Sequence, residues 1–335
     1  MRAFSLVNVA RGERMKYAIG VDLGGSHTMA AVVDTKGRIV EKFKRDLTSL
    51  EVGHVVDEIG TVVGKALKSV KGKTFAGIGL GSPGSIDERN GDIRYSPNFG
   101  WRNVPLGKLL AKRLGHNVHI LNDARCATLG EADHGSGRGA RDFALITLGT
   151  GLGGGFIANG KLVIGASMGA GEVGHHQIRP DDGFVCKCGK TGCFEAQASG
   201  TGLIRHALAL APSFPRSTLL AGDPATWGTK GVREAMLRGD LHAATAWKRW
   251  MADLAIGVAN IVAFMNPEII ALGGGAGQVD KKVLSQPLTA MVDELTTMSP
   301  PGKTKIVSAK LGNDAGAVGA AALAFHGGVK GLLRE

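Results

Sequence analysis

Three cysteines lie within eight residues of one another in the middle of the chain. Their spacing is Cys186-x-Cys188 followed by Cys193, and two adjacent histidines precede them. Thiolates and a neutral imidazole are the ligands that Zn²⁺ prefers, and four of them complete a tetrahedral structural site. Buried or redox-active cysteines are the alternative, which such a tight cluster disfavours. We therefore expect the three cysteines and one histidine to bind a structural zinc ion.

Two aspartates stand where apolar strands are expected to end. Asp123 follows Asn122 after a strand at 118–121, and Asp22 follows a strand at 16–21. The carboxyl ends of strands are where α/β sheets bind ligands, and a carboxylate there can accept a proton or hold a metal ion. The Asn-Asp pair could also cap the next helix, and Asp22 could stabilise its own turn. The residue types alone leave these alternatives open.

Three glycine-rich turns each follow an apolar strand, and we call them the first (22–26), second (149–154) and third (273–277) glycine turns. Their backbone N–H groups could surround phosphate oxygens, so together they predict a polyphosphate site. The pattern G-x-G-x-x-G occurs at 79–84 and 149–154, but neither copy opens a helix, so we reject a dinucleotide fold. A GxxxxGK[ST] loop is absent from the sequence, which excludes a P-loop.

The elements that would position these residues occur twice along the chain. Each copy begins with a meander of strands, expected at 16–21, 30–33 and 38–43 and again at 143–147, 156–158 and 161–164. Further strands are expected at 75–79, 118–121 and 268–272, and helices at 52–70, 104–114, 124–133, 244–265 and 315–325. An internal duplication of an α/β half explains this layout.

Length and composition fit a globular protein with two lobes. The chain has 335 residues, of which 44% are hydrophobic and 21% charged. Its longest apolar run, at 256–265, is too short to cross a membrane, and the first 14 residues lack a signal-peptide cleavage site. The net charge of +11 comes from scattered basic residues, which favours a surface suited to a nucleotide over nucleic-acid binding. We expect a cytoplasmic protein without membrane or nucleic-acid partners.

Several segments resemble one family of sugar kinases. AIGVDLGGSHT and TLGTGLGGG resemble the two phosphate motifs of the sugar kinase, Hsp70 and actin superfamily, and IIALGGGAG resembles its adenosine motif. GEVGHHQIRPDDGFVCKCGKTGCFE resembles the signature of the ROK family, G-E-x-G-H followed by C-x-C-G-x-x-G-C-x-E. SPNFGWRNVPL and LNDARC resemble its glucokinase branch. The similarity runs from about Tyr17 to the end of the chain.

The resemblance implies a fold and an assembly. The expected class is α/β, a two-lobed, duplicated actin-like (ribonuclease H-like) ATPase fold with a cleft between the lobes. We expect an N-terminal extension at 1–15, a small lobe at 16–123 joined by the C-terminal helix, and a large lobe at 124–335. The large lobe would carry the zinc segment at 172–195. The resemblance also implies a homodimer or a homotetramer.

The resemblance also assigns roles to residues. Asp123 would be the base that accepts the proton of the sugar 6-hydroxyl, and Asp22 would work with Mg²⁺. The zinc ligands would be Cys186, Cys188, Cys193 and His175, with His176 as the fallback. The hexose would be held by Asn98, Asn122, Asp123, Glu172, His175 and Glu195. The nucleotide would be held by Asp22, Gly24, Gly25, Ser26, Thr150, Gly151, Gly273, Gly274 and Gly275.

The activity that the resemblance implies is ATP-dependent phosphorylation of glucose at its 6-hydroxyl. Fructose, N-acetylglucosamine or N-acetylmannosamine are alternative substrates, because the family shares its motifs across these sugars. A sugar-responsive repressor would need a winged helix-turn-helix ahead of the first phosphate motif, and only about twenty residues precede Asp22. The sequence leaves the phosphoryl donor open among ATP, ADP and polyphosphate.

Two residues after the LNDA segment need separate interpretation. Arg125 stands where the family pattern has a small residue; it could place a cation near the phosphates, but we interpret it as a surface residue of the helix. Cys126 lies far in sequence from the other cysteines, and we interpret it as a small buried side chain.

Overall fold

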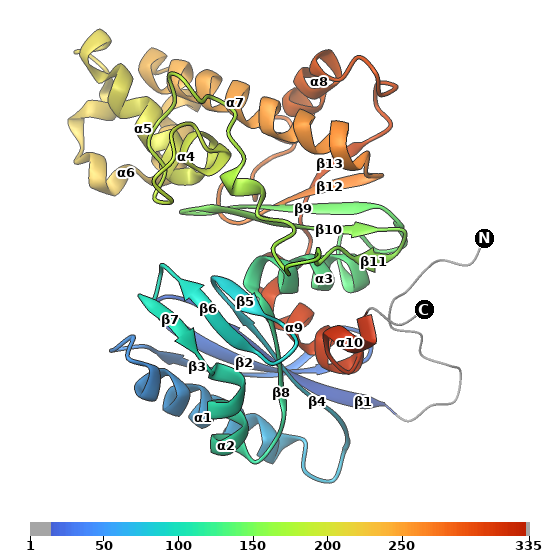
Figure 1. The fold of residues 1–335 in the computed structure, drawn as a ribbon. Coiled ribbons are helices and arrows are strands. Elements are labelled where there is room, and N and C mark those ends of the chain that lie inside the picture. Colours follow the sequence, from blue (N-terminus) through green and yellow to red (C-terminus); the bar gives the residue numbers. More distant parts are fainter. Residues whose placement is uncertain (1–14, 333–335) are drawn as a thin grey trace. The chain divides into compact units, whose positions relative to one another are not determined.

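The computed structural model describes residues 15–332. The extension expected at 1–15 lies outside these residues, apart from Met15. Two five-stranded sheets dominate the chain, with strand orders β3-β2-β1-β4-β8 and β11-β10-β9-β12-β13 (Figure 1). The strands of the first sheet are β1 (Lys16–Leu23), β2 (His27–Asp34), β3 (Ile39–Asp46), β4 (Thr74–Ser82) and β8 (Val118–Asn122). Those of the second are β9 (Phe143–Leu148), β10 (Leu152–Ala158), β11 (Lys161–Leu162), β12 (Ile269–Gly273) and β13 (Lys305–Ser308).

The two sheets repeat one topology. In each order a three-strand meander is followed by two later strands, and β1, β4 and β8 are parallel, as are β12 and β13. This repeat confirms the duplicated α/β fold. Several element boundaries differ from expectation, most clearly that of β10, which begins at Leu152, so that the last glycines of the second glycine turn continue as a strand.

The remaining elements are helices and one small sheet. The helices are α1 (Val52–Ser69), α2 (Leu106–Leu114), α3 (Asp123–His134), α4 (Phe194–Ala198), α5 (Gly200–Leu210), α6 (Pro224–Leu237), α7 (Leu241–Met265), α8 (Ser285–Leu295), α9 (Ala315–Phe325) and α10 (Val329–Leu332). Short 3₁₀ turns lie at η1 (Val173–His175), η2 (Ala211–Ser213), η3 (Thr218–Ala221) and η4 (Gly312–Asp314). The small antiparallel sheet contains β5 (Ser85–Asp87), β6 (Asp92–Ser96) and β7 (Trp101–Val104). Within residues 15–332, no helix is both long and apolar enough to cross a membrane.

The chain divides into two compact units. Among the described residues, the first unit contains 15–143, 155–171 and 310–332, and the second contains 144–154 and 172–309. The boundary expected from the sequence instead lay after Asp123. Helix α3 belongs to the first unit because it packs along α9, which lies in the same unit.

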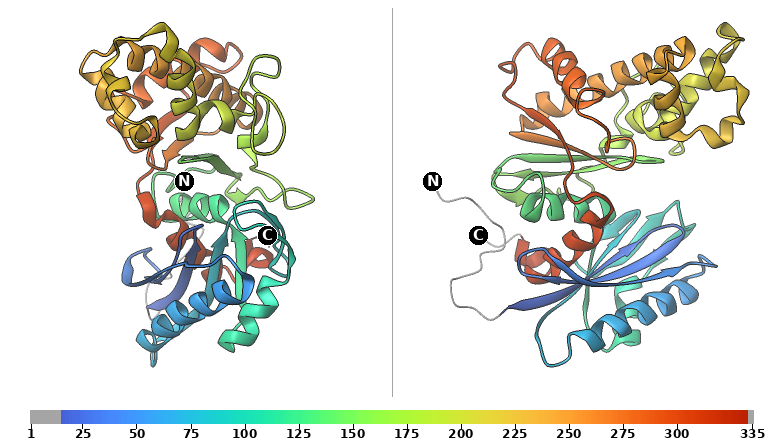
Figure 2. Two further views of the ribbon diagram at one scale, coloured as in Figure 1. Left: turned by 90° about the vertical axis from the view of Figure 1, so that its left-hand side faces the viewer. Right: turned by 180° about the vertical axis from the view of Figure 1, so that it is seen from behind.

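In the first unit, the sheet is covered on both faces. Side chains alternate along a strand, so Ile19 and Val21 of β1 pack into the core under α1, whereas Ala18 packs with Ala317 and Ala321 of α9. Figure 2 shows these layers from two further sides, with α1 in blue and α9 in red. The α9 face of the sheet therefore carries small side chains, and the α1 face carries larger ones.

Helix α9 lies so close to the sheet that glycine is required beneath it. A Cβ atom at Gly20 would lie 1.9 Å from the carbonyl oxygen of Ala317, and one at Gly79 would lie 1.8 Å from that of Ala320. The contact with α3 is equally close, since a Cβ at Gly319 would lie 1.6 Å from the carbonyl oxygen of Cys126. The backbones of these elements thus touch without intervening side chains.

We predict that Gly79→Ala destabilises the protein by about 3 kcal/mol or more, because the added methyl group meets the rigid backbone of α9 at Ala320. The measurement is the free energy of unfolding from urea titration. The control is Gly64→Ala in α1, where a Cβ atom meets nothing within 4 Å. That change should leave stability equal or raise it by up to about 1 kcal/mol, because alanine favours a helix. Equal stabilities of the two variants would contradict the close packing.

Candidate active site

Parallel strands of the first sheet end side by side and bring the predicted acidic residues to one edge. Asp22 on β1 is level with Gly81 on β4, and Ser82 on β4 is level with Asn122 on β8. Asp123 follows directly as the first residue of α3. The register therefore places Asp22, Asn122 and Asp123 at the carboxyl edge of the sheet, where α/β proteins bind ligands.

Hydrogen bonds separate the roles of Asn122 and Asp123. The side-chain oxygen of Asn122 accepts a hydrogen bond from the backbone N–H of Arg125 at 3.2 Å, so Asn122 is the N-cap of α3. Its amide nitrogen donates to the carbonyl oxygen of Gly84 at 3.3 Å. The Asp123 carboxylate accepts from the N–H of Ala124 at 2.9 Å and is half-buried. The capping alternative thus applies to Asn122, and Asp123 lies at the edge with a partly accessible carboxylate.

Asp22 has an unusual electrostatic environment. Burial, and to a smaller extent the charge of Asp123, raises the pKa of Asp22 to about 6. The start of α9 lies against this carboxylate, since a Cβ atom at Gly316 would lie 3.0 Å from its Oδ1. Two neighbouring carboxylates that repel each other are a set that suits a bound cation, and oxygen ligands are those that Mg²⁺ prefers. The residues present therefore fit a magnesium ion.

The first glycine turn also lies in the first unit. The N–H of Gly24 donates to the carbonyl oxygen of His27 at 2.9 Å, which closes the turn between β1 and β2. Gly25 and Ser26 at its tip are exposed, and the Ser26 hydroxyl lies 3.3 Å from Nδ1 of His27. The tip thus presents backbone N–H groups and a hydroxyl to solvent or to a ligand.

The second and third glycine turns meet within the second unit. The N–H of Ala276 donates to the carbonyl oxygen of Leu148 at 2.9 Å. Gly274 has a φ of +73°, and a Cβ atom there would lie 2.5 Å from the same carbonyl oxygen. Only glycine fits both constraints. Thr150 at the tip of the second turn is exposed, and its carbonyl oxygen accepts from the hydroxyl of Thr201 at 2.7 Å.

The four predicted zinc ligands lie together in the second unit. One donor atom from each of His175, Cys186, Cys188 and Cys193 lies within 4.8 Å of the others. The Sγ atoms of Cys188 and Cys193 are 3.6 Å apart, and Nδ1 of His175 is 3.8 Å from Sγ of Cys186. Three sulfurs and one imidazole nitrogen at these separations match the donor set of a tetrahedral zinc site.

The neighbouring histidine has a different environment. The His176 ring packs on Phe194 with centroids 5.1 Å apart, and its Nδ1 lies 2.5 Å from the carbonyl oxygen of Val173. Burial lowers the pKa of His176, which favours a neutral ring. The geometry thus favours His175 over His176 as the fourth ligand.

Glu195 connects the cysteine cluster to the second glycine turn. It stands two residues after Cys193, and its Oε2 accepts a hydrogen bond from the N–H of Leu152 at 2.9 Å. Its other oxygen lies 3.9 Å from Sγ of Cys186. A Cβ atom at Gly151 would lie 2.5 Å from Oε2, so glycine is needed there to admit the carboxylate.

The two remaining predicted hexose residues lie at exposed positions. Asn98 lies in the turn between β6 and β7 of the first unit. Glu172 precedes η1 and is the first residue of that segment to belong to the second unit. Within its own unit, each set of residues is assembled as described, the acidic edge in the first and the Cys/His cluster with Glu195 in the second.

The interpretation of Arg125 as a surface residue is wrong. Arg125 is 1% exposed and forms an ion pair with Glu88, which sequence reasoning did not single out. Helix α3 is buried at every position from Arg125 to Asp133, so it offers no solvent face at this point. The absence of an amphipathic pattern in this helix was the available signal. Cys126, by contrast, is fully buried as expected.

Comparison with known proteins identifies the family. The ROK family matches residues 18–326. The chain belongs to the ROK family. A glucokinase from Thermotoga maritima is 39% identical over 308 residues, which cover 91% of this chain and 96% of the relative. A glucokinase from Halalkalibacterium halodurans is 36% identical over 312 residues, which cover 91% of this chain and 93% of the relative. The crystal structure of a ROK glucokinase from Streptomyces griseus in complex with glucose and AMPPNP has a TM-score of 0.79 at 34% identity, covering 92% of this chain and 98% of that one.

The raised pKa of Asp22 predicts a pH dependence for this ROK protein without added nucleotide or Mg²⁺. Folding raises the pKa from 3.8 to about 6, so the folded chain binds this proton more tightly than the unfolded chain does. Its contribution to stability therefore falls as the pH rises from about 4 to about 6 and stays unfavourable above that range. Asp22→Asn should raise the free energy of unfolding at pH 8 by about 2 kcal/mol relative to the parent, and the difference should vanish near pH 4. Urea titrations at both pH values measure it, and a variant that is less stable than the parent at pH 8 would contradict the assignment.

The Cys/His cluster predicts one zinc ion per ROK chain. His175→Ala should weaken zinc binding by more than about a hundredfold, because it removes one of the ligands. His176→Ala is the matched control and should retain the parent zinc content, since that ring packs on Phe194 instead. Elemental analysis after dialysis against a weak chelator gives the zinc content of each variant. Loss of zinc from His176→Ala alone would exchange the roles of the two histidines.

Proposed function

We propose that the protein is an ATP-dependent glucokinase that phosphorylates the 6-hydroxyl of glucose, with Asp123 as the catalytic base. The observation that carries the proposal is the carboxyl edge of the first sheet, where Asp123 stands beside Asn122 and Asp22. Full-length similarity to glucokinases supports the substrate, because relatives at 36–39% identity carry that name.

In the proposed reaction, the 6-oxygen of glucose attacks the γ-phosphorus of ATP while its proton passes to the Asp123 carboxylate. The new bond joins the sugar oxygen to phosphorus, and the bond between phosphorus and the oxygen bridging to ADP breaks. Asp123 suits this role because its carboxylate is half-buried and the adjacent N–H of Ala124 holds one of its oxygens. Asn122 orients the hexose through its side-chain amide, which can form further hydrogen bonds besides those to Arg125 and Gly84.

The phosphates of ATP are held by backbone amides and hydroxyls in this proposal. The exposed tips of the first and second glycine turns supply Gly24, Gly25, Ser26, Thr150 and Gly151, and Asp22 holds Mg²⁺. The third glycine turn, with Gly273, Gly274 and Gly275, holds the nucleoside portion. The magnesium ion neutralises charge on the β- and γ-phosphates when it is bound. Since a P-loop lysine is absent from the sequence, these N–H groups and the cation would carry the phosphate charge.

The zinc ion has a structural role in this proposal. His175, Cys186, Cys188 and Cys193 bind it, and their cluster fixes Glu195 through the adjacent chain. Glu172, His175 and Glu195, together with Asn98, then hold hexose hydroxyls. A metal ion that takes no part in the reaction can thus define the substrate geometry by fixing its neighbours.

The cellular setting and assembly remain predictions. Three closely spaced thiols that bind a metal suit a reducing compartment, so we place the enzyme in the cytoplasm. A homodimer or homotetramer is expected from the family resemblance, and sedimentation of the purified chain measures it.

The proposed base is tested by Asp123→Asn. We expect kcat with glucose and ATP to fall by about 10²–10⁴, because the amide cannot accept the proton, while KM for glucose changes by less than about tenfold. The matched control is Asp57→Asn, which removes an exposed carboxylate that pairs with Arg113 on the surface, and it should keep the parent kcat. An unchanged kcat in Asp123→Asn removes Asp123 from the mechanism.

The parent should also be assayed with glucose, fructose and N-acetylated hexosamines, each with ATP, ADP and polyphosphate as donors. The highest kcat/KM is expected for glucose with ATP. A preference for an N-acetylated hexosamine would contradict the glucokinase assignment and support a kinase for that sugar.

A further inference from the structure

A buried ion pair involves Arg125, which lies two residues after the proposed base in α3. Arg125 on α3 pairs through its guanidinium with the carboxylate of Glu88, and the two side chains are 2% and 0% exposed. Burial raises the pKa of Glu88 to about 7, although the charge of Arg125 opposes this rise. Burying two charges is costly, and well-packed apolar residues of similar volume are often at least as stable. Stability alone therefore gives little reason for this pair.

The pair holds one particular loop. The second guanidinium nitrogen of Arg125 donates to the carbonyl oxygen of Met168 at 2.9 Å. The backbone N–H of Glu88 lies 3.2 Å from the sulfur of the same methionine. Met168 has a φ of +61°, which is unfavourable for a residue with a side chain, so the contacts hold the loop in a strained conformation. We call residues 165–170 the methionine loop.

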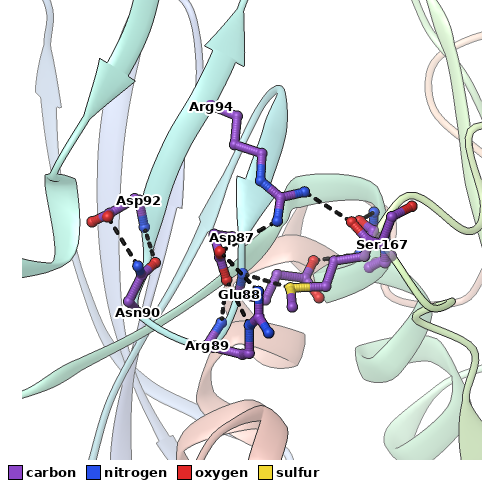
Figure 3. Close-up of polar contacts among 9 residues, drawn as sticks. Asp87, Glu88, Arg89, Asn90, Asp92, Arg94 and Ser167 are labelled. Atoms are coloured by element: carbon purple, nitrogen blue, oxygen red, sulfur yellow. Dashed lines mark hydrogen bonds and ion pairs between the residues drawn. The ribbon is translucent and has the colours of Figure 1, made fainter.

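A second arginine holds the same loop from the small sheet. Arg94 donates to the carbonyl oxygen of Ser167 at 2.8 Å and pairs with Asp87 at 3.2 Å (Figure 3). Arg89, the residue after Glu88, also pairs with Asp87, at 3.1 Å, and is mostly exposed. Two consecutive carbonyl groups of the methionine loop are thus bound by arginines from two different elements, β6 and α3.

The methionine loop is bound to α3 and leads along the chain to Glu172. Its partner Arg125 stands two residues after Asp123, and the backbone N–H of Arg125 donates to the side chain of Asn122. After the loop, the chain passes through Gly171, with a φ of +86°, into Glu172. The first unit ends at Gly171 in this segment, so the loop lies just before the chain re-enters the second unit at Glu172.

We propose that Arg125 and Glu88 are positioning residues for the hexose. They fix the methionine loop to the start of α3, where Asp123 lies. The chain that leads to Glu172 and His175 therefore starts from a loop whose position is fixed. This inference rests on the proposed function, because it takes those residues as hexose ligands. Loosening the anchor should weaken hexose binding and leave nucleotide binding largely intact.

The experiment replaces the pair without leaving a lone buried charge. In the double variant Glu88→Leu with Arg125→Met, apolar groups of similar length fill the site, so the fold should keep its thermal midpoint to within a few degrees. Arg125→Lys is the second variant, since lysine keeps the charge but lacks the planar fork that reaches both Glu88 and Met168. The control is Arg89→Lys, which alters an exposed arginine of the same hairpin whose guanidinium pairs with Asp87.

Two readouts separate positioning from a purely structural role. Hydrogen exchange of the amides at 165–171 should be at least about tenfold faster in the double variant than in the parent, because the loop loses its bond to α3 and retains the bond from Arg94 to Ser167. KM for glucose should rise roughly tenfold with KM for ATP within about twofold, since a shift of the order of 1 Å at a binding group has effects of this size or larger. Arg125→Lys should show the same pattern more weakly, and Arg89→Lys should match the parent in both readouts.

Each contrary outcome has a definite meaning. Parent-like exchange in a double variant that stays folded would show that the pair does not hold the loop, and faster exchange with an unchanged KM for glucose would show that the loop does not position the hexose. Either result overturns the inference. If the double variant does not fold, Arg125→Lys decides by the same two criteria. A parent that phosphorylates no hexose refutes the proposed function instead, and the exchange measurement still shows whether the pair anchors the loop.

Discussion

The direct backbone contact of α9 with its neighbours is the constraint on which the first unit depends. Gly20 and Gly79 in the sheet and Gly319 in the helix leave no room for any other side chain. Because α9 touches β1, β4 and α3, the strand that ends at Asp22 and the helix that begins at Asp123 are fixed against the same element. Packing between backbones transmits displacement more faithfully than packing between flexible side chains. A sheet edge that holds two carboxylates in register, as the proposed function requires, gains from such stiffness.

This stiffness also explains how the unit tolerates unfavourable electrostatics. Burial raises the pKa values of both Asp22 and Glu88; the charge of Asp123 adds to the rise at Asp22, and the charge of Arg125 opposes the rise at Glu88. In a looser structure such groups would turn toward water, but here strand register and helix contacts hold them in place. Perturbed carboxylates of this kind cluster at functional sites, where ligands and cations supply the missing compensation. Asp22 is compensated in the proposed complex by Mg²⁺, whereas Glu88 is compensated within the protein by Arg125.

The features that could be predicted from the sequence are local and periodic. The duplicated meander followed from alternation and turn residues, and the ends of β1 and β8 followed from where their apolar runs stop. The Cys/His cluster followed from spacing, whereas the preference for His175 came from the family resemblance. The partnership of Arg125 with Glu88 could not be predicted, because 37 residues separate them and no periodicity links a hairpin to a helix. Likewise, the positive φ of Met168 could not be predicted, since residues far away in the sequence, Arg125 and Glu88, contact it.

The two units solve the same positioning problem by different means. In the first, glycines bring backbones together and buried side chains anchor a loop. In the second, the segment that carries His175 and the cysteines has little regular structure beyond η1, and short backbone contacts hold it together. A Cβ atom at Gly192 would lie 1.7 Å from the carbonyl oxygen of Arg179, and one at Gly174 would lie 2.1 Å from that of Leu152. The Cys/His cluster and the hydrogen bond from Leu152 to Glu195 add to these contacts, and the hydrogen bond joins the segment to the second glycine turn. A metal ion can stiffen such a segment further, because four ligands from a short stretch become one rigid body. On this argument a zinc ion would do in the second unit what α9 does in the first, which is to hold in place backbones that glycines bring close together.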